Sequence, residues 1–99
     1  MKRGAIYRYE PKGSPRQRDV LIVSADGIND SGRSWLYALD VRDSDGGELL
    51  AVRLPDGRWA DGCSLTRVYR EWLTGPQQGE VDADTLHHVE AMLRSGLDL

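Results

Sequence analysis

The run Val20-Leu21-Ile22-Val23 constrains the fold more than any other stretch of the sequence. It is the densest run of β-branched and aliphatic residues in the chain, and charged or polar residues bound it on both sides. Such a short apolar run predicts a strand buried on both faces, although periodicity alone leaves a short helix open. Arg16 and Arg18 precede the run, and a polar turn over residues 24–29 follows it. Loops that a packed strand holds in place often carry functional side chains, so both ends of this strand are candidate sites. The alternative is a core strand with solvated flanks.

The size and composition predict one soluble domain spanning residues 1–99. Hydrophobic residues make up 39% and charged residues 29% of the 99 residues, as in ordinary globular proteins. No apolar run approaches the about 20 residues that a membrane helix needs. The basic start of the chain is not followed by the apolar segment of a secretory signal, and the single Cys63 cannot form an internal disulfide. We therefore expect a cytoplasmic protein.

The sequence shows no metal or cofactor motif. Two adjacent histidines, His87 and His88, stand far along the chain from the single thiol of Cys63 and do not make a metal-ligand pattern with it. A lone cysteine is more often a small buried side chain than a nucleophile. We therefore expect no cofactor.

Charge is distributed unevenly along a chain whose net charge is -3. Residues 1–18 hold six basic residues and one acidic residue, a net charge of +5, whereas residues 79–99 have a net charge of -4. A basic segment in an acidic protein favours a local anionic partner over general polyelectrolyte binding. A charged surface that only confers solubility is the alternative.

The pattern of residues predicts several strands followed by one C-terminal helix. The expected strands are Ala5–Glu10, Val20–Ala25, Ser34–Arg42 and Glu48–Leu54, with one or two more in Arg58–Trp72. A turn or single helical turn is expected at residues 26–30, and Asp61-Gly62 allows a break or bulge. Apolar residues at helical spacing predict a helix that Asp82 caps and that ends near Gly96. This order indicates an α+β fold with a small curled antiparallel sheet or barrel.

Four segments, taken in order, resemble the MazF/PemK family of toxin–antitoxin ribonucleases. They are Lys2–Tyr7, Arg18–Ser24 followed by Asn29, Ser64–Val68 with Leu73, and the terminal helix with Val89, Leu93 and Leu97-Asp98-Leu99. Each motif is weak alone, and the assignment depends on their order and spacing across most of the chain. The sequence departs from the family where Ala5 replaces an acidic residue, Asp19 replaces a proline, and Thr66-Arg67 inverts the usual order.

The resemblance implies a small SH3-like antiparallel β-barrel with a C-terminal α-helix. It also implies a homodimer that cleaves single-stranded RNA without metal, by attack of a 2'-hydroxyl on the adjacent phosphate. The expected partner is a MazE-like antitoxin whose disordered acidic tail covers a basic groove.

The resemblance places the catalytic arginine at Arg18, whose planar guanidinium suits the charge that develops on a phosphate. The family's second catalytic position, a Thr or Ser, falls on Asp40 or Val41. Asp40 is expected to act as a general base if it is held near Arg18. The alternatives are that its carboxylate repels phosphate, or that it pairs with Arg18 and leaves the site inert. The residues expected to bind RNA are Lys12, Ser14, Arg16, Asn29 and Arg67. Trp35 and Tyr37 offer stacking faces if they are exposed, and core packing is their favoured alternative.

Two alternatives belong to other functional classes. A catalytically degenerate barrel would bind RNA or a protein partner without cleavage, which the departures at Asp19 and Asp40 favour. The CcdB toxins share this fold and poison DNA gyrase through an aromatic-containing C-terminal helix, but this chain ends in Gly-Leu-Asp-Leu. A gyrase contact is therefore the weaker interpretation.

Overall fold

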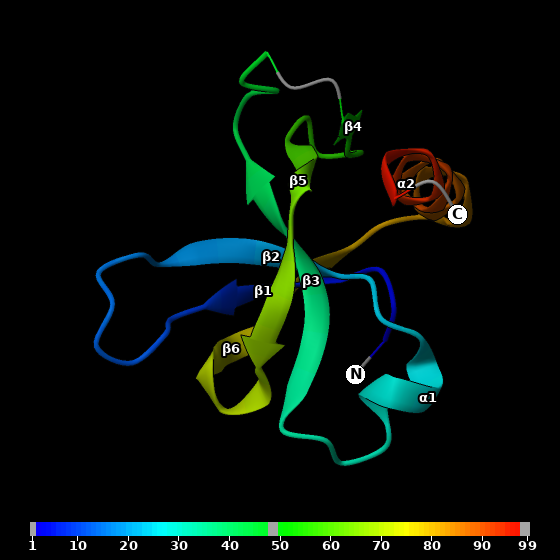
Figure 1. The fold of residues 1–99 in the computed structure, drawn as a ribbon. Helices are drawn as coiled ribbons and strands as arrows, with labels where there is room; N and C mark the ends of the chain where they lie inside the picture. The colour runs from blue at the N-terminus through cyan, green and yellow to red at the C-terminus, as the bar shows by residue number, and fades with distance from the viewer. Residues whose placement is uncertain (1, 48–49, 98–99) are drawn as a thin grey trace.

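The computed structural model describes residues 2–47 and 50–97, and shows six antiparallel strands with a long C-terminal helix (Figure 1). In space the strands follow the order β4-β5-β3-β2-β1-β6. The sheet is curled. Hydrogen bonds do not close it into a complete barrel, because β4 and β6 remain as its two edges. The elements are β1 (Ala5–Tyr9), β2 (Arg18–Ile22), α1 (Asp26–Asn29), β3 (Trp35–Arg42), β4 (Ala51–Arg53), β5 (Trp59–Tyr69), the short 3-10 helix η1 (Arg70–Trp72), β6 (Leu73–Glu80) and α2 (Ala83–Leu97).

Strand β2 is buried on both faces, as its apolar run predicts. Leu21 packs on one face in a cluster that includes Val89 of α2. Val20 and Ile22 pack on the other face with Leu36 of β3. All five side chains are fully buried. Side chains alternate across a strand, so β2 serves both hydrophobic clusters and lies at the centre of the molecule.

Several predicted elements are confirmed with shifted ends. Strand β2 begins at Arg18 and ends at Ile22, earlier than the expected Val20–Ala25. The expected Glu48–Leu54 strand is shorter, because only Ala51–Arg53 pair with β5, while residues 48–49 lie outside the described residues. The segment Arg58–Trp72 forms one long strand followed by a 3-10 turn.

Strand β6 is not predicted by the sequence pattern. Its sequence, LTGPQQGE, contains two glycines and a proline, which are depleted in strands. It nevertheless pairs with β1, from Tyr9↔Leu73 to Ala5↔Glu80 with a register shift between. Pro76 lies within an edge strand, where a missing N–H group is tolerated. Tertiary pairing therefore overrides the local preference here.

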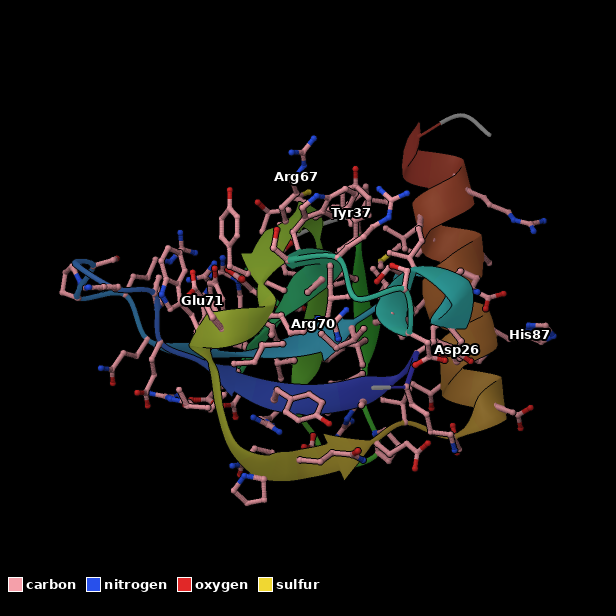
Figure 2. All side chains as sticks on the ribbon, turned by 90° about the horizontal axis from the view of Figure 1, so that it is seen from below. Asp26, Tyr37, Arg67, Arg70, Glu71 and His87 are labelled. Carbon is pink, nitrogen blue, oxygen red and sulfur yellow. The ribbon has the colours of Figure 1, made fainter. Side chains whose placement is uncertain are left out.

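Helix α2 begins where the sequence predicts and extends one residue beyond Gly96. The backbone N–H of Thr85 donates to Oδ1 of Asp82 at 2.8 Å, so the expected cap is present. His87 and His88 are exposed, and Figure 2 shows His87 pointing away from the sheet. Among the described residues, no helix has the length and apolarity needed to cross a membrane. The expected terminal Asp98-Leu99 lies outside the described part of the chain.

Replacing Asp82 tests this cap. Hydrogen bonds from the side chain and backbone of Thr85 lower the pKa of Asp82 below its ordinary value of 3.8. A carboxyl with a lowered pKa stabilises the fold fully above its unfolded-state pKa, and this contribution disappears as pH falls through the folded-state pKa. We expect Asp82→Ala to lower the melting temperature at about pH 7, and the difference from wild type to shrink at about pH 2.

Asp82→Asn is the matched control, because asparagine also caps helices but carries no charge. Its melting temperature, followed by circular dichroism, should stay near that of the wild type at neutral pH. An Asp82→Ala loss that is the same at both pH values would contradict the titration argument.

Candidate functional site: an arginine–aspartate pocket

The alternation of side chains along β2 and β3 brings Arg18 and Asp40 together. Val20 of β2 lies opposite Asp40 of β3, and Arg18 stands two residues before Val20 on the same face. The two candidate catalytic side chains are therefore diagonal neighbours. Nε of Arg18 donates a hydrogen bond to Oδ1 of Asp40 at 2.7 Å. Val41, the other position considered for the second catalytic group, packs in the core cluster on the opposite face.

Asp40 is a buried carboxylate surrounded by guanidinium groups. Only 4% of the residue is exposed. Besides the bond from Arg18, its Oδ2 accepts a hydrogen bond from Nη2 of Arg16 at 2.8 Å and lies 3.5 Å from Nη2 of Arg42. A buried charge is costly unless it is paired and hydrogen-bonded. The three arginines therefore meet the electrostatic requirement of Asp40.

A second buried carboxylate, Asp61, lies directly opposite Asp40 across the β3–β5 pair. It is 5% exposed. Like charges at opposed positions of two strands destabilise a sheet. Arg42 offsets this repulsion, because its Nε donates to Oδ2 of Asp61 at 2.9 Å while its Nη2 approaches Asp40. Three guanidinium groups thus surround two carboxylates and leave one excess positive charge.

The predicted irregularity at Asp61-Gly62 is present as a bulge in β5. The register passes from Ala38↔Thr66 to Asp40↔Asp61, so one residue of β3 lies opposite four residues of β5, three more than in a regular ladder. Oγ of Ser64 closes this loop, because it accepts the N–H of Asp40 at 2.7 Å and donates to the carbonyl of Asp61 at 2.6 Å. A Cβ at Gly62 would lie 2.8 Å from the carbonyl oxygen of Leu50, so this position has no room for a side chain.

These residues line an open pocket of about 470 Å³. Its lining is formed by Arg16, Arg18, Asp40, Arg42, Asp61 and residues 63–66 of the bulge. The guanidinium of Arg18 also lies over the ring of Tyr9, 5.1 Å from its centroid. The excess positive charge and the many N–H donors suit a phosphate group.

Asp19 lies next to Arg18 in sequence but points to the opposite face of β2. Its carboxylate binds Nη1 of Arg58 at 2.5 Å and lies 3.6 Å from Nη1 of Arg8. The burial of Arg58 is the largest single effect and acts to lower its pKa, but hydrogen bonds and charge attraction to Asp56 and Asp19 together outweigh it and raise the pKa above its ordinary value. The negative charge that replaces the family's proline is therefore neutralised away from the pocket.

The loop between β1 and β2 carries three of the residues expected to bind RNA, and it projects beyond the sheet (Figure 1). Lys12 is exposed and forms no ion pair with the described residues. Oγ of Ser14 accepts the backbone N–H of Arg16 at 3.2 Å, which helps shape the approach to the pocket. Arg16 itself reaches Asp40, so this loop leads directly into the pocket.

Asn29 does not lie in this pocket. It is 1% exposed, its Nδ2 donates to the carbonyl of Ser24 at 2.9 Å, and its Oδ1 accepts the Ser24 hydroxyl at 2.5 Å. Its amide is therefore committed to holding the turn after β2. The expectation that Asn29 lines an RNA path is corrected, because a buried side chain with satisfied hydrogen bonds has no surface to offer RNA.

Arg67 lies apart from the lining of the pocket, on a partly exposed aromatic surface. Its guanidinium stacks over the ring of Trp35 at 4.8 Å, and Arg33 approaches the same ring at 5.6 Å. Tyr37 packs edge-on against Trp35 with centroids 5.1 Å apart. Figure 2 shows Arg67 and Tyr37 on the same side of the sheet. Trp35 and Tyr37 are half-buried, so neither is a full core residue.

The basic N-terminal segment is partly neutralised within the fold. Lys2 lies 3.1 Å from Glu80, and Arg3 lies 3.3 Å from Glu90. The charge asymmetry of the sequence thus reflects, in part, ion pairs between the two ends of the chain. Among the described residues, no group of three or more His, Cys, Asp or Glu side chains is arranged to hold a metal ion.

Sequence reasoning missed Arg42, Asp61 and Ser64 as members of this pocket. A signal for Arg42 was present, because Arg16 and Arg18 alternate before one strand and Asp40 and Arg42 alternate at the end of the next. Alternation predicts a shared face only when the register is known. The bulge that brings in Asp61 and Ser64 depends on tertiary pairing.

Removing the Ser64 hydroxyl should weaken the fold at the pocket. Ser64→Ala leaves the N–H of Asp40 without its hydrogen bond in a buried setting, a loss of about 1–3 kcal/mol in the free energy of unfolding. Urea denaturation measures this loss, with Ser14→Ala on the exposed loop as the control. Equal stability of the two variants would show that water replaces the hydroxyl.

Comparison with known proteins agrees at the level of the fold. The sequence matches no known family model and no curated protein. Among solved structures, an endoribonuclease in complex with its cognate antitoxin, from Mycobacterial species, superimposes with a TM-score of 0.84 at 19% identity, over 100% of this chain and 96% of that chain. A MazE–MazF complex from Deinococcus radiodurans gives a TM-score of 0.82 at 20% identity, with 100% and 96% covered.

A crystal structure of MazF from Deinococcus radiodurans gives a TM-score of 0.77 at 18% identity, over 99% of this chain and 96% of that chain. At such low identity, the likeness establishes the backbone architecture alone, and the function has to be argued from the residues of the pocket. The chain has the fold of the MazF endoribonucleases over its whole length.

Proposed function

We propose that this protein is the toxin of a type II toxin–antitoxin system, a metal-independent endoribonuclease that cuts single-stranded RNA at defined sequences. The observation that carries this proposal is the Arg18–Asp40 pair at 2.7 Å, set in a cationic pocket of a MazF fold. The fold raises the expectation of RNA cleavage, and the pocket supplies the groups that such a reaction requires.

The proposed reaction begins with the 2'-hydroxyl of the RNA. Asp40 accepts the proton from this hydroxyl as its oxygen forms a bond to the adjacent phosphorus. The bond from phosphorus to the 5'-oxygen of the next nucleotide breaks, and that oxygen takes a proton from solvent. The products are a 2',3'-cyclic phosphate and a 5'-hydroxyl end.

Arg18 stabilises the negative charge that grows on the non-bridging oxygens of the phosphate. Its Nε is bound to Asp40 and its Nη1 donates to the carbonyl of Arg16 at 3.3 Å, so the guanidinium is held in place before substrate arrives. A pre-organised donor stabilises a transition state without the cost of reorientation. In this scheme guanidinium groups supply the positive charge, so no metal ion is required.

The proposed path of the RNA joins the cations at the entrance of the pocket to an aromatic surface outside the pocket. Lys12 and Arg16 attract the backbone at the entrance, and Arg16 is exposed enough to exchange Asp40 for a phosphate. The Trp35–Arg67 surface offers a stacking face for an unpaired base. Cations beside aromatic rings are typical of proteins that bind single strands.

Two partners are part of the proposal. One is a MazE-like antitoxin, because the named neighbours include toxins solved with their antitoxins. An acidic, disordered tail would find Lys12, which forms no ion pair with the described residues, and the exposed Arg16 at the entrance of the pocket. The other is a second copy of this chain in a twofold dimer.

Cleavage of a long unstructured RNA in EDTA tests the proposed reaction. Arg18→Ala should lower the cleavage rate by about 10²–10³-fold, because it removes the main donor to the developing oxyanion. Asp40→Asn should lower the rate by about 10²–10⁴-fold, because the amide keeps the shape of the carboxylate but cannot accept the proton.

Arg53→Ala is the matched control, since Arg53 is exposed on β4 and does not line the pocket. Its rate should equal that of the wild type. Circular dichroism confirms that each variant is folded. No cleavage of several RNAs by the folded wild type would remove the nuclease assignment for those sequences.

The stacking surface gives a separate prediction. Trp35→Ala should weaken binding of a single-stranded oligonucleotide by about tenfold, because stacking on an aromatic side chain is worth about 1–3 kcal/mol per base. Trp35→Phe keeps an aromatic face and should retain most of the affinity. Fluorescence anisotropy measures both. If Trp35→Ala binds like the wild type while its melting temperature falls, Trp35 acts in packing alone.

A non-cutting barrel is the second candidate function. The observation that favours it is that Asp40 already engages both Arg16 and Arg18, so a carboxylate takes donors that a phosphate would use. Such a protein would bind RNA or a protein partner without cleavage. Retained RNA affinity with no cleavage by the wild type would support this alternative.

A further inference from the structure

We propose that Arg42 is a second phosphate-binding residue of the pocket and that Asp61 is the positioning residue that aims it. This inference rests on the proposed function, because it assigns further groups to the same RNA site. Neither residue belongs to the segments that resemble the toxin family. The assignment follows from the contacts of Arg42, from its exposure, and from the register of β3 with β5.

Arg42 is held on one edge and open on the other. Its Nε donates to the buried Asp61 at 2.9 Å, and its Nη2 lies 3.5 Å from Asp40. Nη1 forms no hydrogen bond with the described residues, and 46% of the side chain is exposed. A guanidinium presents five N–H donors in a rigid fork. The remaining donors of Arg42 therefore face the open pocket.

Arg42 and Arg18 approach the carboxylate of Asp40 from two sides. Arg18 binds its Oδ1, whereas Arg42 lies near its Oδ2. A phosphate placed beside the proposed base Asp40 would therefore meet a guanidinium on either side. Two cations on one phosphate stabilise charge on both of its non-bridging oxygens.

Asp61 gives Arg42 a fixed direction. Its backbone is held by the bulge, since its carbonyl accepts the Ser64 hydroxyl and its Oδ1 accepts the N–H of Cys63 at 2.9 Å. Its carboxylate is buried, so it has few positions available. Ordering a long arginine side chain costs conformational entropy. Because Asp61 already orders Arg42 in the folded protein, RNA binding does not incur this cost again.

A purely structural ion pair is the competing explanation. Arg42 would then serve only to neutralise Asp40 and Asp61, and its exposed edge would have no ligand. The two explanations predict different dependences of the RNA affinity on salt concentration. Each phosphate contact contributes about 0.7 to the slope of log affinity against log salt for a single strand, whereas a structural pair contributes none.

The experiment measures this slope with a single-stranded 2'-O-methyl oligonucleotide, which has no free 2'-hydroxyl and so is not cut by the proposed reaction. Arg42→Ala should make the slope shallower by about 0.7, and Arg53→Ala should leave it unchanged. Because Arg42→Ala leaves Asp61 unpaired and can unfold the protein, the Arg42→Gln/Asp61→Asn double variant is also measured. It preserves the net charge and should show the same shallower slope.

Asp61→Asn tests the positioning role with cleavable RNA. Arg42 keeps its charge but loses its anchor, so kcat should fall on the order of tenfold to a hundredfold while KM changes little. A structural role alone would lower the melting temperature and leave kcat of the folded protein at the wild-type value, which would overturn the positioning role.

The outcomes separate this inference from the proposed function. A wild-type slope in both Arg42 variants overturns the inference, and if the wild type still cuts RNA while Arg18→Ala does not, the nuclease assignment stands. A shallower slope in both variants with no cleavage by the wild type supports the phosphate site and removes the nuclease assignment. A wild type that does not bind the oligonucleotide overturns the inference.

Discussion

The burial of Asp40 is the constraint on which the pocket depends. A carboxylate that is 4% exposed within a sheet requires partners, and Asp61 directly opposite adds a second negative charge. Arg18 of β2 and Arg42 of β3 pair with these carboxylates, and Arg16 adds a third guanidinium from the loop between β1 and β2. Because the arginines are held by these carboxylates, the pocket is ordered and cationic before any ligand arrives. The same pairing that neutralises the buried carboxylates thus holds the arginines in the positions that the proposed phosphate site requires.

The register of β2 decides which charges face this pocket. Arg18 and Asp19 are adjacent, yet one binds Asp40 while the other binds Arg58 on the far face. A shift of one residue would exchange the two and place a carboxylate in the pocket. Val20 and Leu21 prevent this exchange, because each packs in a different hydrophobic cluster. The core packing of β2 therefore also fixes Arg18 on the side of the pocket and Asp19 on the other side.

The comparison with solved structures shows a shared fold at low sequence identity. A TM-score of 0.84 at 19% identity means that the strand order and helix position are shared although most side chains differ. In this chain the pocket is built from a guanidinium cluster around two carboxylates, a combination that fits acid–base chemistry on a phosphate. Function depends on such a site and not on the fold that carries it. The chemistry of Arg18, Asp40 and Arg42 is therefore the part that experiment has to decide.

The sequence by itself determined the central strand and the capped helix, which follow from an apolar run and from helical spacing behind Asp82. Arg18 and Asp40 became candidates through the resemblance of short motifs to the MazF/PemK family. Only the tertiary structure decided that Asp40 faces Arg18, that Asn29 is buried, and that β6 forms from a Gly- and Pro-containing segment. The physical reason is that register, bulges and edge pairing depend on partners distant in sequence, which local conformational preference does not specify.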